Sequence, residues 1–349
     1  MANEITKINT ITLANIAKFN EQNDSDMEKF NGAEFTGTIA WLGSRAVIGG
    51  GEGTSGNVNV IQYKNVGASA DTQDFGDLTS SRREFKGTGS NITRGMWIAG
   101  FVTGSNQVTD TDYVTVGSTG NATDFGDSSN AAYSGGQEGG SNGTLAFGVG
   151  GFASGAGNQQ DAMEYFTIAS TGNGTDAGDL TVARNGLTSS DGNSRALNFG
   201  GYDGGASNVD TIDYHTFSTS ADAADHGDTS NQTRNGATAE DASRVVYALG
   251  VGLNGNRVDD IDYYNPDSPG DATDFGDTSQ AREALTGASN GTLGEFYGGI
   301  IQDGHSNVTV NTCDKITIQT TGDAADTGDL VTAGSTSGVV EDAGALSGT

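Results

Sequence analysis

The sequence is poor in the residues that crosslink or stiffen a chain. Of its 349 residues, one is cysteine, Cys313, and two are proline. A single cysteine cannot form an intrachain disulfide and supplies no thiol cluster for zinc. Glycine is abundant, at 56 residues, but collagen would also need frequent proline and a glycine at every third position. Packing and hydrogen bonds must therefore hold the fold together.

The sequence also lacks long apolar runs and positive charge. No segment is long and apolar enough to span a bilayer, and MANEITKINT does not have the basic-then-apolar layout of a secretory signal. Lys and Arg number 16 against 45 Asp and Glu, for a formal net charge of −29. This charge repels phosphate backbones and anionic lipids, so we expect neither nucleic acid nor a membrane as a partner.

What the sequence does contain is an internal repeat, most visible in an aspartate-rich phrase. The phrase reads DTQDFGD at 71, NATDFGD at 121, NGTDAGD at 173, DAADHGD at 222, DATDFGD at 271 and DAADTGD at 323. Two other series keep step with it: an apolar run that ends in a glycine doublet, and an alternating segment centred on tyrosine. Three markers in register indicate six units of about 50 residues. The central aspartates of the phrase are Asp74, Asp124, Asp176, Asp225, Asp274 and Asp326.

Each unit has the pattern of short β-strands. In residues 184–228, the short run GLTSS leads to the turn signal DGN, RALNFGG is apolar, and VDTIDYHTFST alternates with period two. Four-stranded units repeated six times predict an all-β fold, a six-bladed β-propeller over residues 36–349. Residues 36–51 and 333–349 each offer part of a unit, so we expect strands from both termini to close the ring. Both ends offer a first strand, and the pattern does not decide which is inserted.

These units resemble the kelch repeat. The similarity lies in the apolar strand with its Gly-Gly doublet, the Tyr-containing strand and the Arg before the next unit, and GGYDGG at 200–205 is especially similar. The tryptophan that is usual on the last strand of a kelch repeat is missing, and the aspartate-rich phrase lies near its position. More narrowly, units with ATDFGDL and AR resemble repeat proteins of marine and cyanobacterial phage virions. That resemblance implies a structural protein of a tailed phage, on the particle surface.

Residues 1–35 follow a different pattern and form a separate arm. ITKIN at 5, IAKFN at 16 and MEKFN at 27 repeat every 11 residues. If the arm is helical, the apolar residues form a stripe that implies a right-handed supercoil with partner helices; extended strand-turn units are the alternative. A closed propeller has no place for these residues, so we expect an assembly anchor that contacts other virion proteins or copies of this chain. The anchor residues are Ile5, Ile8, Ile16, Phe19, Met27 and Phe30.

The aspartate phrase has two interpretations. Asp and Asn cap turns through nearby backbone N–H groups while Gly supplies a positive φ, and a structural device would recur in every blade. Carboxylates on Gly-containing loops also suit calcium, although the spacing is not that of an EF-hand. We favour the turn interpretation over the calcium site, and we expect no cofactor apart from that calcium alternative. The calcium candidates are Asp71, Asp74, Asp77, Asp222, Asp225, Asp228, Asp271, Asp274, Asp277, Asp323, Asp326 and Asp329.

Two classes of function follow from the sequence. The first is a non-enzymatic virion protein, anchored by its arm and displaying the propeller as a fibre, spike or decoration, with a host-surface glycan as its expected external partner. The second is a propeller that binds or degrades glycans. His215, His226 and His305 lie in separate repeats without metal-binding spacing, and near-identical carboxylates offer no acid-base pair. We therefore expect no catalysis.

Overall fold

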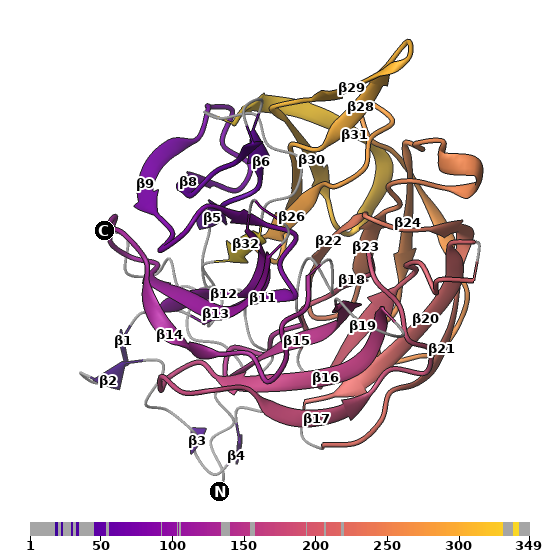
Figure 1. Ribbon diagram of the computed structural model, residues 1–349. Helices are drawn as coiled ribbons and strands as arrows, with labels where there is room; N and C mark the ends of the chain where they lie inside the picture. The colour runs from indigo at the N-terminus through magenta and orange to yellow at the C-terminus, as the bar shows by residue number, and fades with distance from the viewer. Residues whose placement is uncertain are drawn as a thin grey trace, which may run out of the picture.

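The alternating and apolar runs of the repeat form antiparallel strands, which assemble into six blades around a ring in the computed structural model (Figure 1). The structure describes residues 45–330 and 338–341, with gaps at 54–55, 92, 103, 105, 134–139, 154–157, 193, 206 and 218–219. It also describes residues 18–19, 22–23, 29–30 and 33–34. The expected all-β, six-bladed β-propeller is confirmed.

Every blade runs from an inner strand at the centre of the ring to an outer strand at its periphery (Figure 1). Blade 2 contains β11 (Gly87–Ser90), β12 (Arg94–Val102), β13 (Asn106–Thr115) and β14 (Thr123–Asp127), with β10 (Arg82–Arg83) also paired to β12. Blade 3 contains β15 (Leu145–Phe152), β16 (Gln159–Thr167) and β17 (Thr175–Asp179), and a single bridge from Ser141 to Ala146 takes the inner place.

The other three blades built from one continuous segment repeat this order. Blade 4 contains β18 (Thr188–Ser189), β19 (Arg195–Phe199), β20 (Val209–Thr216) and β21 (Ala224–Thr233). Blade 5 contains β22 (Ala237–Glu240), β23 (Val245–Ala248), β24 (Asp260–Tyr264) and β25 (Thr273–Asp277). Blade 6 contains β26 (Thr286–Ser289), β27 (Leu293–Tyr297), β30 (Thr312–Thr317) and β31 (Thr320–Asp329).

Blade 1 closes the ring with strands from both ends of the chain, as expected. Its inner strand is β32 (Gly338–Glu341), followed by β5 (Arg45–Gly49), β8 (Val60–Asn65) and β9 (Gln73–Asp77). β32 pairs antiparallel with β5, with Gly338 opposite Gly49 and Glu341 opposite Ala46. The C-terminal segment is therefore the one that supplies the closing strand, the point that the repeat pattern left open.

The hydrophobic core lies between the blades rather than within them. The buried apolar side chains of the described residues form six clusters, and each joins two adjacent blades. Between blades 1 and 2, for example, Val47, Ile61 and Phe75 pack against Phe85 and Trp97. Because every blade uses both faces of its sheet in this way, a blade cannot bury its apolar surface without both neighbours.

Strands also occur in the arm and in the loops between second and third strands. β1 (Lys18–Phe19) pairs with β2 (Gln22–Asn23), and β3 (Lys29–Phe30) pairs with β4 (Ala33–Glu34), at the 11-residue offset of the sequence repeat. For these residues the structure has paired strands rather than the helix that the sequence left open. Between the second and third strands of blade 1 lie β6 (Glu52–Gly53) and β7 (Gly56–Asn57); those of blade 6 are β28 (Ile300–Asp303) and β29 (Ser306–Thr309). The same loop of blade 5 holds the 3-10 turn η3 (Leu253–Gly255).

Candidate functional site

The aspartate phrase is a bulged outer strand, which corrects the expectation that it forms a turn. In β9, Asp74 pairs with Gln62 and Gly76 pairs with Ile61, so Phe75 is the extra residue of a β-bulge. The bulge turns Phe75 inward, where its side chain is buried and meets Tyr63 edge-on at 5.8 Å. The corresponding residue of every other blade is also buried: Phe125, Ala177, His226, Phe275 and Thr327. The phrase therefore contributes one buried side chain to the packing of each blade.

The polar residues of the phrase join each blade to the next. The first Asp or Asn of one blade accepts a hydrogen bond, through Oδ1, from the backbone N–H of the last Asp in the preceding blade's phrase. This bond occurs at all six junctions, with N–O distances of 3.1–3.3 Å. At the closure, Asp329 donates to Asp71, 258 residues away in the chain. We call this ring of contacts the outer girdle.

The glycine of the phrase permits the close approach that the girdle needs. Gly76 has φ +151°, and a Cβ on it would lie 2.4 Å from the carbonyl oxygen of Gly120 in the next blade. Gly120 in turn donates its N–H to the carbonyl of Phe75 at 2.7 Å. Only glycine adopts this backbone without strain and leaves room for the neighbouring chain. The expected positive φ is confirmed, and its use is contact between blades rather than a local turn.

Carboxylates gather where the girdle crosses each junction. The calcium candidates are exposed, with Asp77 half-buried. Desolvation, followed by repulsion from neighbouring aspartates, raises the pKa of Asp179, Asp228 and Asp277. Among the described residues, no three His, Cys, Asp or Glu side chains are arranged to hold a metal ion. Calcium binding stays a prediction that the arrangement of these carboxylates does not favour.

A second polar series lies inside the ring, on the third strand of each blade. The position before the tyrosine of the repeat holds Asp112, Glu164, Asp213, Asp262 and Asp314 in blades 2–6, and Gln62 in blade 1; all are buried. Each carboxylate accepts a backbone N–H, at 2.7–3.1 Å, from the Ser or Thr that follows the preceding blade's phrase. The buried carboxylates therefore fix the start of every linker between blades from 1 to 6.

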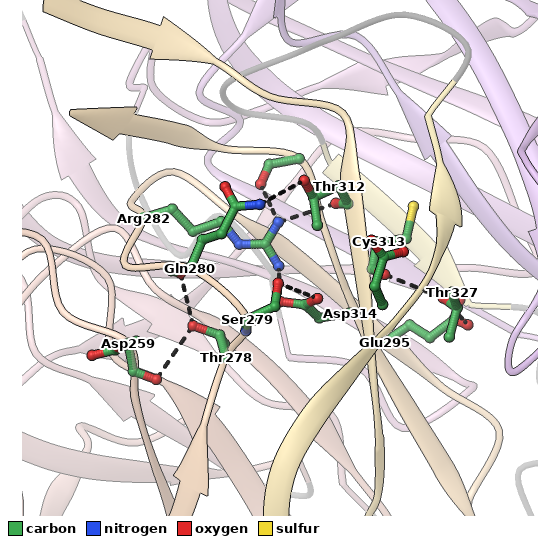
Figure 2. Close-up of polar contacts among 12 residues, drawn as sticks. Asp259, Thr278, Ser279, Gln280, Arg282, Glu295, Thr312, Cys313, Asp314 and Thr327 are labelled. Carbon is green, nitrogen blue, oxygen red and sulfur yellow. Dashed lines mark hydrogen bonds and ion pairs between the residues drawn. The ribbon is translucent and has the colours of Figure 1, made fainter. Parts of the chain in front are cut away.

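Cations neutralise most of these carboxylates. Arg282 donates to Asp314 at 2.7 Å and to the carbonyls of Gly298 and Thr312 at 3.0 and 3.1 Å (Figure 2). Arg82 and Arg184 pair with the buried carboxylates of blades 2 and 4 in the same way. The side chains of all three arginines are fully buried.

Two blades solve the same problem differently. In blade 3, where Ala132 replaces the arginine, Lys86 reaches Glu164 at 2.8 Å from the linker of blade 2. In blade 5, Thr233 replaces the arginine, and none of the described lysines or arginines pairs with Asp262. Burial raises the pKa of Asp262, whose hydrogen-bond donors are Ser230 and the hydroxyl of Tyr264.

His215, His226 and Cys313 lie in the core, whereas His305 is exposed. The ring of His215 lies 4.5 Å from that of Phe147, tilted by 37°, and His215 contacts the amide of Asn198, which also donates to Asp213. Complete burial, opposed by the nearby Asp213 carboxylate, lowers the pKa of His215 to about 4. Burial likewise raises the pKa of Cys313 to about 12, as expected of a small core residue. Neither side chain is poised for chemistry at neutral pH.

The anchor residues fall mostly outside the described residues. Phe19 and Phe30 lie at equivalent places in β1 and β3. Ile5, Ile8, Ile16 and Met27 lie outside the part of the chain that the structure describes. The anchor role therefore stays a prediction, with its 11-residue spacing now expressed as strand pairs.

Sequence reasoning missed two features of the ring. Arg45, Arg94 and Arg244 open the second strands of blades 1, 2 and 5, stack on the tyrosine of their own blade, and donate to a backbone carbonyl of the next blade at 2.7–3.0 Å. Their spacing in step with the repeat could have revealed this series. The second feature is a row of half-buried aromatic side chains, Phe101, Tyr133 and Phe152, which the repeat does not predict because it breaks the repeat.

Comparison with known proteins adds no family to this picture. No protein-family model matches the chain, and no curated protein matches it in sequence. In the described part of the chain, no helix is long and apolar enough to cross a membrane. The assignment of the fold therefore rests on the geometry of the six blades alone.

Proposed function

We propose that this protein is a non-enzymatic structural component of a tailed-phage virion, which displays its propeller at the particle surface. The observation that carries the non-enzymatic part is the use of the repeated polar residues. The phrase aspartates and the third-strand carboxylates make contacts between blades at equivalent places around the ring. A group committed to holding the ring together in every blade serves architecture, whereas catalysis needs a pair in unequal environments.

The ring suits permanent exposure to solvent. Its contacts combine the girdle with six apolar clusters and buried ion pairs, and the clusters and buried pairs resist screening by salt better than surface pairs do. The net charge of −29 makes copies of the protein repel one another in solution. The virion setting rests on the resemblance of the ATDFGDL units to phage repeat proteins, and fold alone does not assign it.

The arm supplies the attachment in this proposal. Its 11-residue repeat places Ile5, Ile16 and Met27 in step, outside the repeats that build the ring. Burying each large apolar side chain is worth about 1.5–3 kcal/mol, so the six anchor residues together could hold the chain firmly on a partner surface. The partners are other virion proteins or further copies of this chain.

Incorporation into particles tests the proposal. We expect a chain that begins at residue 36 to fold as the full chain does, by circular dichroism and thermal unfolding, yet to be absent from purified particles by mass spectrometry. A full chain with Phe19→Ser and Phe30→Ser is the matched variant, since it keeps the arm and removes two anchors. Normal incorporation of the shortened chain would remove the anchor. Hydrolysis of a surface glycan, abolished by one carboxylate substitution, would refute the non-enzymatic role.

A further inference from the structure

A row of side chains crosses blades 1, 2 and 3 where the second strands end. It begins with the ion pair between Glu52 and Arg83, and the Arg83 guanidinium lies 5.3 Å above the ring centre of Phe101. Phe101 then contacts Tyr133, with ring centres 5.1 Å apart, and Tyr133 contacts Phe152 at 5.4 Å. We call the three rings the aromatic ladder.

The ladder occupies two equivalent positions of the repeat. One position follows the glycine pair of the second strand and holds Glu52, Phe101, Phe152, Tyr202, Val251 and Ile300 in blades 1–6. The other, in the linker, bridges to the first and holds Arg83, Tyr133, Asn185, Arg234 and Glu283 in blades 2–6. At these two positions, among the described residues, rings contact one another only where blades 2 and 3 meet. The fold therefore does not require them, because blades 5 and 6 make the same backbone bridge without aromatic side chains.

The ladder is also set apart by its exposure. The described aromatic residues are either buried between blades or belong to the half-buried tyrosines of the repeat, apart from four. Those four are the ladder and Tyr202, and all are half-buried. An aromatic side chain that leaves part of its surface in water, in contact with two others, forms the kind of apolar patch that marks a binding surface.

Polar groups frame one end of the ladder. Arg83 Nε lies 3.1 Å from Glu84 Oε1, and Arg83 also pairs with Glu52. Glu84 has a left-handed backbone, φ +51°, a conformation that side chains other than glycine and asparagine rarely adopt. The amide of Asn57 donates to the carbonyl of Phe101 at 2.9 Å and ties the β6–β7 hairpin to the ladder. Donors and acceptors are thus held in place beside the rings.

We propose that the aromatic ladder, with Arg83 and Glu84, is a binding subsite for a neutral saccharide. The C–H face of a sugar ring packs on aromatic side chains, while a paired guanidinium and carboxylate offer donors and acceptors to its hydroxyls. An anionic glycan is disfavoured by the net charge of −29. A small cation would meet Arg83 at the framed end of the ladder. A neutral sugar therefore suits this surface, because its C–H face can pack on the aromatic rings while its hydroxyls bond to the guanidinium and the carboxylate.

This inference deepens the proposed display role by naming what the displayed ring contacts, and it rests on that role for its biological setting only. Sugar binding and particle incorporation are separate measurements, so either proposal can fail while the other stands. Full-length protein is applied to an array of immobilised oligosaccharides: neutral chains of glucose, galactose, mannose and rhamnose, together with sialylated and sulfated chains. We expect binding to a subset of the neutral chains.

Substitutions then locate the site. Phe152→Ala should weaken binding to the selected neutral oligosaccharide by about tenfold or more, measured in solution by calorimetry, because truncating an aromatic side chain that anchors a ligand commonly has this effect. Tyr202→Ala is the matched control: it removes a half-buried ring from the equivalent position of blade 4, outside the ladder, and should leave affinity unchanged. Equal thermal unfolding of the two variants confirms that the comparison concerns binding. The proposal is overturned if no neutral chain binds, if only charged chains bind, or if Phe152→Ala binds as well as the unsubstituted protein.

Discussion

The outer girdle and the buried third-strand position serve the same purpose, yet the blades treat them differently. In the girdle, all six junctions use the same bond, from a backbone N–H to an Asp or Asn oxygen. On the third strand, the buried position holds a carboxylate in five blades and a neutral glutamine in one. The carboxylate pairs with an arginine in three blades and with a lysine in one, and in the remaining blade it accepts a hydrogen bond from a hydroxyl.

The difference follows from which atoms make the contact. The girdle depends on backbone atoms in close approach, so its geometry must recur and the glycine cannot vary. The inner position depends on side chains, and any set that satisfies the buried oxygens is acceptable. Repetition in the sequence therefore marks backbone contact, while variation at a buried polar site marks interchangeable partners.

The largest expected effect comes from breaking an inner ion pair. Asp314→Asn leaves the buried guanidinium of Arg282 without its carboxylate, and we expect a loss of about 3–5 kcal/mol in the free energy of unfolding. Asp262→Asn is the matched control in blade 5, where no cation loses a partner, and it should cost less than about 1 kcal/mol. Urea unfolding of both variants measures the difference. Equal costs would show that the ion pair adds nothing to the stability that the hydrogen bonds at this position provide.

Acid should separate the buried His215 from the girdle. His215 stays neutral in the fold, with a pKa of about 4 against an ordinary 6.5, so the unfolded chain binds its proton first as pH falls. The His215 contribution to stability is intact above about pH 6.5 and is lost progressively down to about pH 4. That pKa difference corresponds to about 3 kcal/mol.

The girdle has the opposite sign. The pKa values of Asp179, Asp228 and Asp277 are raised, so the fold binds their protons first and gains stability on mild acidification. The difference in unfolding free energy between the unsubstituted protein and His215→Phe isolates the histidine, because the girdle is common to both. That difference should change by about 3 kcal/mol between pH 7 and pH 4. A constant difference would assign the acid sensitivity to another group.

Substituting a girdle glycine should cost less. A Cβ on Gly276, at φ +146°, would lie 2.5 Å from the backbone of Gly322 in the next blade. We expect Gly276→Ala to destabilise by about 1–3 kcal/mol, through strain and displacement of the neighbouring chain. Gly270→Ala is the control, because open space surrounds that position. Thermal unfolding compares them, and similar melting temperatures would mean that the blades separate easily at the girdle.

The smallest effect concerns the charge of the girdle. Asp323 accepts the N–H of Asp277, and Asn121 shows that a neutral amide accepts the same bond in another blade. Asp323→Asn should therefore keep the bond, remove repulsion and lower the pKa of Asp277, which NMR titration reads directly. Stability at pH 7 and low salt should rise by less than about 0.5 kcal/mol. An unchanged Asp277 titration would show that screening already suppresses the repulsion.

Much of the architecture could be predicted because the markers recur in step. The doublets lie at the ends of second strands, and the tyrosines lie on third strands. The phrase was misread as a turn, since Asp and Gly favour turns and bulged strands alike. Glu164 and Lys86 could not be paired in advance, because 78 residues separate them in the chain.

The sequence by itself determined the number of blades and the all-β class, because both can be read from the period of the repeat. Only the tertiary structure decided that β32 is the closing strand, that the phrase joins blades, and that Phe101, Tyr133 and Phe152 meet in one row. These depend on which strand of a closed ring lies beside which. Residues from separate units become neighbours only when the ring closes, so no local sequence pattern could predict these contacts.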